Sequence, residues 1–263
     1  MRRVVVLAWL ALVVLGAAAS QAGSQQSEPR RSGSADMSLS LQAMQADRAT
    51  NPAMLWVQQG YELWQAPPEG ATPAKPSCAQ CHGDVRVSMR GVAAAYPGWD
   101  AAAQKPLNLA QRINQCRVRH QLAAPWKPES EPLLALESVV AYQSLNLPIT
   151  PPAIPQLKPF VLRGAERFRE RMGQLNLSCA HCHEERAGQR LGGNLIPQAH
   201  PTAYPLYRLE WQGLGSLQRR LRNCMNGVRA QAYPFGADAL LELELYLAER
   251  AAGMPLESPG VRP

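Results

Sequence analysis

Two short cysteine motifs constrain this chain more than any other feature. The pentads Cys-Ala-Gln-Cys-His at 78–82 and Cys-Ala-His-Cys-His at 179–183 share the pattern C-x-x-C-H. Two thiols at this spacing attach to the vinyl groups of one haem c, and the following histidine supplies a nitrogen ligand to the iron. A redox-active C-x-x-C or half of a zinc site would explain either pentad alone. The repeated histidine favours two covalently bound haem c groups, with attachment through Cys78, Cys81, Cys179 and Cys182 and with iron ligands His82 and His183.

The first 22 residues are typical of an export signal. Arg2 and Arg3 precede an apolar run over 4–15, and small residues follow as far as Ala22. This order predicts a cleaved signal peptide over 1–22 and a periplasmic protein, with an uncleaved anchor as the alternative. No later apolar run reaches the roughly 18 residues that a spanning helix needs. No membrane span is therefore expected after cleavage.

The segments that follow the pentads also repeat. Residues 109–116 align without gaps with residues 217–224, and each segment ends in a cysteine. Helical patterns follow over 133–145 and 239–251,. Each unit is expected to comprise a helix, the pentad, an irregular loop, a helix that ends in cysteine and a closing helix. Each closing helix contains a tyrosine, and we expect Tyr142 and Tyr246 to occupy equivalent positions in the repeat. The sequence predicts a mostly α-helical protein made of two pseudo-repeated cytochrome c-like haem domains.

Composition marks the boundaries of these units. A stretch over 23–40 that is rich in Ser, Gln, Gly and Arg predicts a flexible leader,. Proline density over 148–158 cannot continue a helix and predicts an extended connector,. The length of 263 residues allows two domains at roughly 100 to 200 residues each,. We expect an N-terminal haem domain over 41–147 and a C-terminal haem domain with the active site over 159–256.

Cys116 and Cys224 remain after four thiols are assigned to haem. They could form one disulfide, as leftover thiols in exported proteins often do. Equivalent points in a repeat more naturally face their own haems, so distal iron ligation is the favoured interpretation. No methionine or histidine recurs at matching places in both halves to take this role. A thiolate ligand would stabilise ferric iron and give each haem a low potential.

The positive charge of the chain, a formal net +7, lies mainly in the second half. Arg112 and Arg220 each stand four residues before their cysteine and on the same helix face, so this spacing alone does not identify an active site,. The second segment is further enriched in arginine by Arg219, Arg222 and Arg229. Arginine favours an ionised thiol and holds oxyanions by paired hydrogen bonds. We expect a small-anion site around Cys224 and no nucleic-acid partner, because no basic run is interleaved with aromatic residues.

Taken together, these residues resemble the SoxA family, the cytochrome subunits of the SoxAX complexes of bacterial thiosulfate oxidation. The resemblance rests on the export signal, the spacing of the pentads, Cys116 after Asn-Gln, and the segment Arg-Leu-Arg-Asn-Cys-Met at 220–225. It implies that His82 and Cys116 hold the iron of the first haem and that His183 and Cys224 hold that of the second. It also implies a persulfide on Cys224 and substrate binding by Arg220.

The resemblance implies an activity as well. Members of this family act as L-cysteine S-thiosulfotransferases, which conjugate thiosulfate oxidatively to a cysteine of the carrier protein SoxYZ. Two electrons then leave through the monohaem cytochrome SoxX, the partner in the heterodimer. A dihaem electron-transfer cytochrome c without sulfur-transfer activity is the alternative. A dihaem peroxidase is a second one, but that class needs an accessible iron, whereas this chain offers a strong ligand to each haem.

Overall fold

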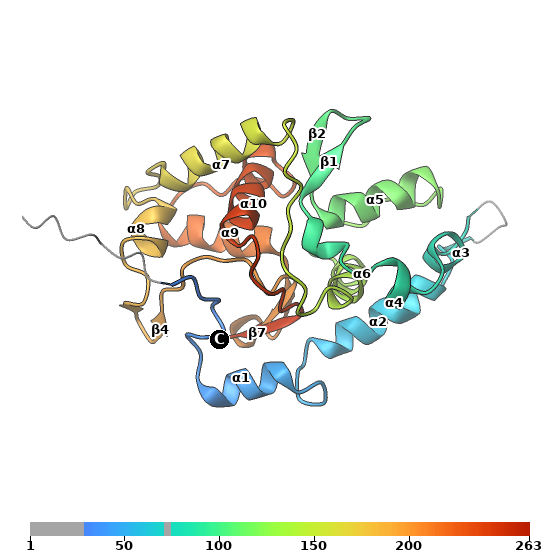
Figure 1. Ribbon diagram of the computed structural model, residues 1–263, viewed down its shortest axis with the longest axis horizontal. Helices are drawn as coiled ribbons and strands as arrows, with labels where there is room; N and C mark the ends of the chain where they lie inside the picture. Colours follow the sequence, from blue (N-terminus) through green and yellow to red (C-terminus); the bar gives the residue numbers. More distant parts are fainter. Residues whose placement is uncertain (1–28, 71–74) are drawn as a thin grey trace, which may run out of the picture. The chain divides into compact units, whose positions relative to one another are not determined.

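Helices dominate residues 29–70 and 75–263, the part of the chain that the computed structural model describes (Figure 1). The predicted signal peptide over 1–22 lies outside these residues. Residues 31–263 form one compact unit. None of the described helices is both long and apolar enough to cross a bilayer. The predicted mostly α-helical class is confirmed.

The two halves repeat one order of elements. The first half contains α1 (Leu39–Ala46), α2 (Met54–Gln65), α3 (Cys78–His82), α4 (Val85–Ser88), η1 (Ala93–Ala95), β1 (Gly98–Asp100), β2 (Lys105–Leu107), α5 (Leu109–Arg119) and α6 (Glu131–Tyr142). The second half contains α7 (Lys158–Arg169), α8 (Cys179–His183), β3 (Arg190–Leu191), β4 (Asn194–Leu195), β5 (Leu206–Arg208), η2 (Leu209–Trp211), β6 (Gly213–Gly215), α9 (Leu217–Gly227), α10 (Asp238–Arg250) and β7 (Gly260–Arg262). Helix, pentad helix, hairpin, cysteine helix and closing helix thus follow each other twice.

The helices that carry Cys116 and Cys224 differ from the prediction at their C-terminal ends. Both were expected to end at the cysteine, but α5 and α9 each continue for three further residues. Their starts agree with the sequence, because Asn108 and Ser216 cap them through side-chain oxygens that accept backbone N–H groups,. Each cysteine therefore has helical backbone on both sides.

Each half contains one closely packed helix pair, α2 on α6 and α7 on α10. Gly60 on α2 faces the carbonyl group of Ala135, and Gly164 on α7 faces the carbonyl group of Glu242. A Cβ atom at either glycine would lie inside van der Waals contact with that carbonyl. Glycine is therefore what allows the two helix backbones to approach in both halves.

The glycine contacts also correct the matching of the closing helices. An added Cβ at Gly60 would lie 2.8 Å from the Cβ of Val139, and one at Gly164 would lie 2.8 Å from the Cβ of Tyr246. Val139 therefore occupies the place of Tyr246. The predicted match between Tyr142 and Tyr246 is wrong by about one helical turn, because residue identity was used where only packing defines equivalence.

Replacing Gly164 with alanine should destabilise the protein. The new methyl group would force α7 away from α10, and overpacking of this kind costs about 1 to 3 kcal/mol, more than the gain of about 1 kcal/mol in helix propensity. Gly227→Ala is the matched control, since its added Cβ meets nothing within 4 Å. Denaturant unfolding of both variants checks this. Equal stabilities would contradict the close contact.

A small sheet joins the C-terminus to the second half. Its strand order is β6-β5-β7, with β5 antiparallel to β6 and parallel to β7. In Figure 1, β7 lies near α1, and the two elements are in contact. Tyr207 of β5 packs in a core cluster with Leu134 and Val261. Side chains alternate along a strand, so Leu206 and Arg208 point to the opposite face.

A flexible leader was predicted over 23–40, but its last ten residues pack as part of the compact unit. The hydroxyl groups of Ser32 and Ser34 both donate to Oε1 of Glu257 at 2.7 Å. α1 begins at Leu39, two residues before the predicted start of the first domain. Residues 31–40 are held against the body of the protein because polar hydroxyls satisfy a carboxylate far away in the sequence. Composition does not reveal such a partner.

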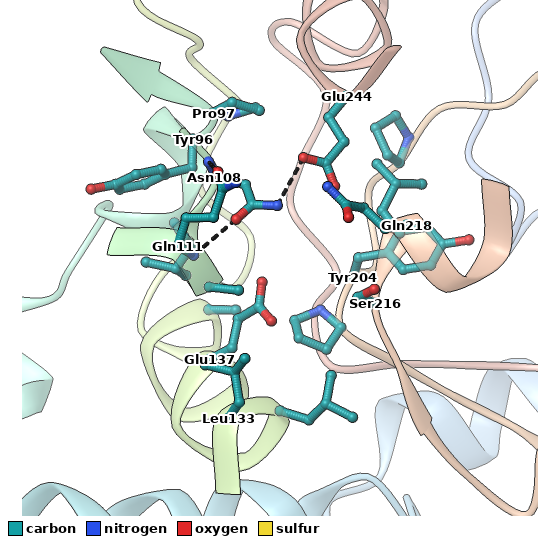
Figure 2. Close-up of a pocket in the computed structure, with 18 of the residues that line it drawn as sticks. Tyr96, Pro97, Asn108, Gln111, Leu133, Glu137, Tyr204, Ser216, Gln218 and Glu244 are labelled. Atoms are coloured by element: carbon teal, nitrogen blue, oxygen red, sulfur yellow. Dashed lines mark hydrogen bonds between the residues drawn. The ribbon is translucent and has the colours of Figure 1, made fainter. Parts of the chain in front are cut away.

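A cavity of about 160 Å³ lies where the two halves meet (Figure 2). Glu137 of α6 and Glu244 of α10 line it, and Nδ2 of Asn108 donates to Oε2 of Glu244 at 3.0 Å. Oε2 of Glu137 is buried without a hydrogen-bond partner among the described residues. Glu129 also lines the cavity, whereas its described lining contains no Lys, Arg or His.

The absence of a positive partner in this lining affects both buried carboxyls. Burial, reinforced by the nearby carboxylates of Glu244 and Glu129, raises the pKa of Glu137 to about 8. Burial also raises the pKa of Glu244 to about 7, although the hydrogen bond from Asn108 opposes the shift. Protons are thus held between the two halves at neutral pH.

Candidate functional site

The two pentads form one-turn helices that begin at serine caps. In α3, the hydroxyl of Ser77 accepts from the backbone N–H of Gln80 at 3.2 Å, and Oε1 of Gln80 accepts from that of Ser77 at 2.7 Å. In α8, Nδ1 of His181 takes the place of the Gln80 side chain and accepts from the backbone N–H of Ser178 at 3.1 Å. His181 is therefore part of the cap. In each pentad the helical turn places the two thiols on the same side, as attachment to one haem requires.

In the first half, the predicted iron ligands line one cavity. Cys78, His82 and Cys116 border a space of about 240 Å³, together with apolar side chains such as Leu136 and Val140. Nε2 of Gln121 donates to Sγ of Cys78 at 3.7 Å. Burial raises the pKa of Cys116, which the charges of Arg112 and Arg119 only partly offset. An apolar space between a histidine and a cysteine suits a haem ring.

In the second half, His183 and Cys224 are direct neighbours. Nδ1 of His183 lies 2.7 Å from the carbonyl oxygen of Pro197. A carbonyl only accepts, so this nitrogen carries the proton, and Nε2 keeps its lone pair for a metal. Burial would raise the pKa of Cys224, but its interaction with His183 and the charge of Arg220, with further lowering contributions, hold it below its ordinary value. The donor set again fits a haem iron.

The remaining cysteines lie with their own pentads. No disulfide joins any of the six, all of which belong to the described residues. Cys116 interacts electrostatically with Cys81, and Cys224 interacts with Cys179 and Cys182. Cys116 and Cys224 therefore do not form the disulfide considered above, because each thiol lies beside the pentad of its own half.

The arginines before the two cysteines have different surroundings. Nη1 of Arg112 donates to Oε1 of Gln115 at 3.0 Å. The guanidinium of Arg220 makes no hydrogen bond or ion pair with any residue that the structure describes. Arg219 lies over the Trp211 ring at 4.2 Å, and Arg222 lies over the Phe235 ring at 4.5 Å. Arg219 and Arg222 also donate to backbone carbonyl groups, whereas the guanidinium of Arg220, one helical turn before Cys224, has open donors.

Sequence reasoning missed Arg208, at the end of β5. This residue is only 9% exposed, and its charge contributes to lowering the pKa of Cys224. Nη2 donates to Oε2 of Glu210 at 2.7 Å, while Nε is buried without a partner among the described residues. Burial and the like charge of Arg220 lower its own pKa. The signal that could have found it is the Tyr-Pro pair at 96–97 and 204–205, which extends the repeat upstream.

Comparison with known proteins places these sites in a family. The model of the SoxA/TsdA cytochrome c domain matches residues 59–149 and 163–256. The "L-cysteine S-thiosulfotransferase subunit SoxA" of Pseudaminobacter salicylatoxidans is 37% identical over 83% of this chain and 76% of its own length. The subunit of the same name from Rhodovulum sulfidophilum is 32% identical over 84% and 76%.

A solved structure has the same fold. The crystal structure of SoxXA from P. pantotrophus aligns with a TM-score of 0.83 and 29% identity, over 89% of this chain and 87% of that chain. The two matched ranges of the family model correspond to the two halves, and each contains one pentad and one capped cysteine helix. The chain therefore belongs to the SoxA family of the SoxA/TsdA cytochromes c, whose prosthetic group is haem c.

Proposed function

We propose that this protein is the catalytic subunit of a periplasmic L-cysteine S-thiosulfotransferase. It binds two haem c groups and pairs with a SoxX-type monohaem cytochrome. The names of its relatives and the SoxXA complex that it resembles support this proposal. The observation that carries it is the site around the partly buried Cys224, whose pKa is lowered by two arginines: Arg220, which has no described partner, and Arg208, whose Nε is buried without one. A cytochrome that only carries electrons has no need of such an anion site.

The residues of both halves fit the haem groups in stated roles. The first haem would be attached through Cys78 and Cys81, with His82 and Cys116 on its iron. The second would be attached through Cys179 and Cys182, with His183 and Cys224 on its iron. When bound, the haems supply the one-electron acceptors through which two electrons pass to the SoxX-type partner.

The net reaction joins thiosulfate to a carrier cysteine of the SoxYZ type. Thiosulfate and the carrier thiol give a carrier S-thiosulfonate, one proton and two electrons. Cys224 is proposed to act as a persulfide, whose terminal sulfur forms an S–S bond with the outer sulfur of thiosulfate as the two electrons leave. The carrier thiolate then attacks that outer sulfur, and the bond to the persulfide breaks. Covalent capture divides one difficult transfer into two steps.

The chain's own side chains prepare this reaction. Arg220 offers unpaired N–H donors to the sulfonate oxygens, which a planar guanidinium binds in pairs. Its position one helical turn before Cys224 directs the outer sulfur of the substrate towards the cysteine,. The positive charge also offsets the dianion as it meets an anionic sulfur.

Arg220→Ala tests this assignment. We expect the KM for thiosulfate to rise about 10- to 100-fold, since a hydrogen bond to a charged group contributes about 1.5 to 3 kcal/mol. The assay is the thiosulfate-dependent mass gain of the carrier, with a SoxX-type acceptor present. Arg112→Ala, the first-half counterpart, is the matched control and should leave the KM unchanged.

Haem content measured on the same samples separates binding from folding. Both variants should retain covalent haem. If Arg220→Ala loses its haem, Arg220 has a structural role. If the unmodified protein never loads the carrier with thiosulfate, the proposed function itself is wrong, and the electron-transfer alternative gains support.

A further inference from the structure

The hairpins that lead into the two cysteine helices are equivalent. β1 pairs with β2 so that Gly98 faces Leu107, and β5 pairs with β6 so that Leu206 faces Gly215. Both hairpins turn through a glutamine in the left-handed region, Gln104 in the first and Gln212 in the second. β2 ends directly before the N-cap of α5, and β6 ends directly before that of α9. Each hairpin thus sets one side chain beside its cysteine helix.

At the last position of the first strand, the two hairpins carry opposite charges. Asp100 ends β1 opposite Lys105, and Arg208 ends β5 opposite Gly213. Both side chains are buried, with exposed fractions of 3% for Asp100 and 9% for Arg208. The repeat has therefore kept the position and its burial while the sign of the charge changed.

In the first half, Asp100 accepts a hydrogen bond from, or lies close to, polar side chains of the helix that carries Cys116. Oδ2 of Asp100 accepts a hydrogen bond from Nε2 of Gln115 at 2.5 Å, and Arg119 lies 3.8 Å away. Gln115 in turn accepts from Arg112, the counterpart of Arg220. This network leaves the buried carboxylate of Asp100 beside the cysteine helix, and it holds Arg112 in a hydrogen bond with Gln115. An anion that approaches this site therefore meets a negative charge.

In the second half, the same place offers open donors. Arg208 has a buried Nε without a partner, and its ion-pair partner Glu210 is 64% exposed. An exposed partner neutralises a buried charge poorly. Arg220, whose guanidinium has no described partner, lies one helical turn before Cys224 on α9, and its like charge lowers the pKa of Arg208. Two such groups are stabilised when a dianion lies between them.

We propose that Arg208 is a second substrate-binding arginine, and that the exchange of aspartate for arginine between the hairpins restricts thiosulfate to the second haem site. This inference rests on the proposed function, and it adds the charge that determines which of the two halves binds thiosulfate. Arg208 and Arg220 together hold the sulfonate end of the dianion, so that its outer sulfur faces Cys224. Asp100 keeps the first site closed to the same anion, although that site also has a histidine, a cysteine and an arginine.

Arg208→Gln tests the binding role. The amide keeps a polar side chain of similar length but removes the charge and the forked donors, so the KM for thiosulfate should rise at least about tenfold. The value of kcat at saturating thiosulfate should fall much less. Arg190→Gln, the same exchange on the exposed strand β3, is the matched control, and its KM should equal that of the unmodified protein. Haem content is measured for each.

A second measurement uses the unmodified holoprotein and so does not depend on folding of a variant. Thiosulfate is titrated against the paramagnetic resonance signals of the two thiolate-ligated haems. Only the signal that Cys224→Ala removes should respond. Equal responses of both haems would overturn the selection, and an unchanged KM in a haem-loaded Arg208→Gln protein would overturn the binding role. Either result leaves the proposed function standing if the unmodified protein still loads the carrier.

Discussion

Cys224→Ala is expected to abolish the transfer of thiosulfate to the carrier. Removal of a residue that forms the covalent intermediate typically costs more than about a thousandfold in rate, because binding alone replaces little of its chemistry. The covalent haem of the second half should remain, since Cys179, Cys182 and His183 are untouched. The measurement is the mass of the carrier after incubation with thiosulfate and a SoxX-type acceptor.

Cys116→Ala provides the matched control for this loss. Cys116 is the equivalent residue in the repeat and lines the first cavity with His82. Its replacement should alter the spectrum of the first haem while the carrier is still loaded. If Cys224→Ala loaded the carrier at the normal rate, the sulfur chemistry would have to take place elsewhere. If both variants were inactive, the first haem would be needed for turnover as well.

The second large effect concerns stability and pH. Glu137 and Glu244 have folded-state pKa values of about 8 and about 7, raised from an ordinary 4.5. Both carboxyls thus bind protons more tightly in the folded protein than in the unfolded chain. The contribution of these two carboxyls to the free energy of unfolding is largest below pH 4.5 and falls as pH rises towards 8,. At about 1.4 kcal/mol per pKa unit, the two shifts together correspond to a loss of up to roughly 8 kcal/mol,.

Glu137→Gln isolates this contribution. The amide stays neutral at every pH, so the variant should be more stable than the unmodified protein at pH 8, with a flatter pH profile. Glu131→Gln, at the exposed start of the same helix, serves as the control and should follow the unmodified profile. Denaturant unfolding of the haem-loaded proteins between pH 5 and 9 measures this. A profile that Glu137→Gln leaves unchanged would show that the carboxylate has a compensating partner.

Local patterns were predictable because the chemistry they encode needs only neighbours in the chain. Both pentads adopt the helical turn that places two thiols together, and the two cysteine helices begin at Leu109 and Leu217, the first residues of the aligned segments. The spacing of Arg220 and Cys224 also follows from helix geometry alone. The helix ends and the match of Tyr246 were predicted wrongly, because both depend on contacts between helices.

Residues outside the pentads and the aligned segments were not found in the same way, because tertiary contacts give them their roles. Arg208 reaches the second site through the register of β5 with β6, and its opposition to Asp100 appears only when the two hairpins are compared. Neither residue lies in the segment whose repeat is visible in the sequence. Glu137 and Glu244 look like ordinary polar positions of two helices until the halves are packed together.

The amino-acid sequence by itself determined the two C-x-x-C-H pentads, the duplication of the units that contain them and the helical class of the fold. These properties depend on residues within one helical turn of each other or on a repeat along the chain. The tertiary structure alone decided that Arg220 is open while Arg112 is committed, that Arg208 and Asp100 place opposite charges beside equivalent cysteines, and that two glutamates share a cavity. Burial and charge depend on what surrounds a side chain, and packing supplies those surroundings from distant parts of the chain.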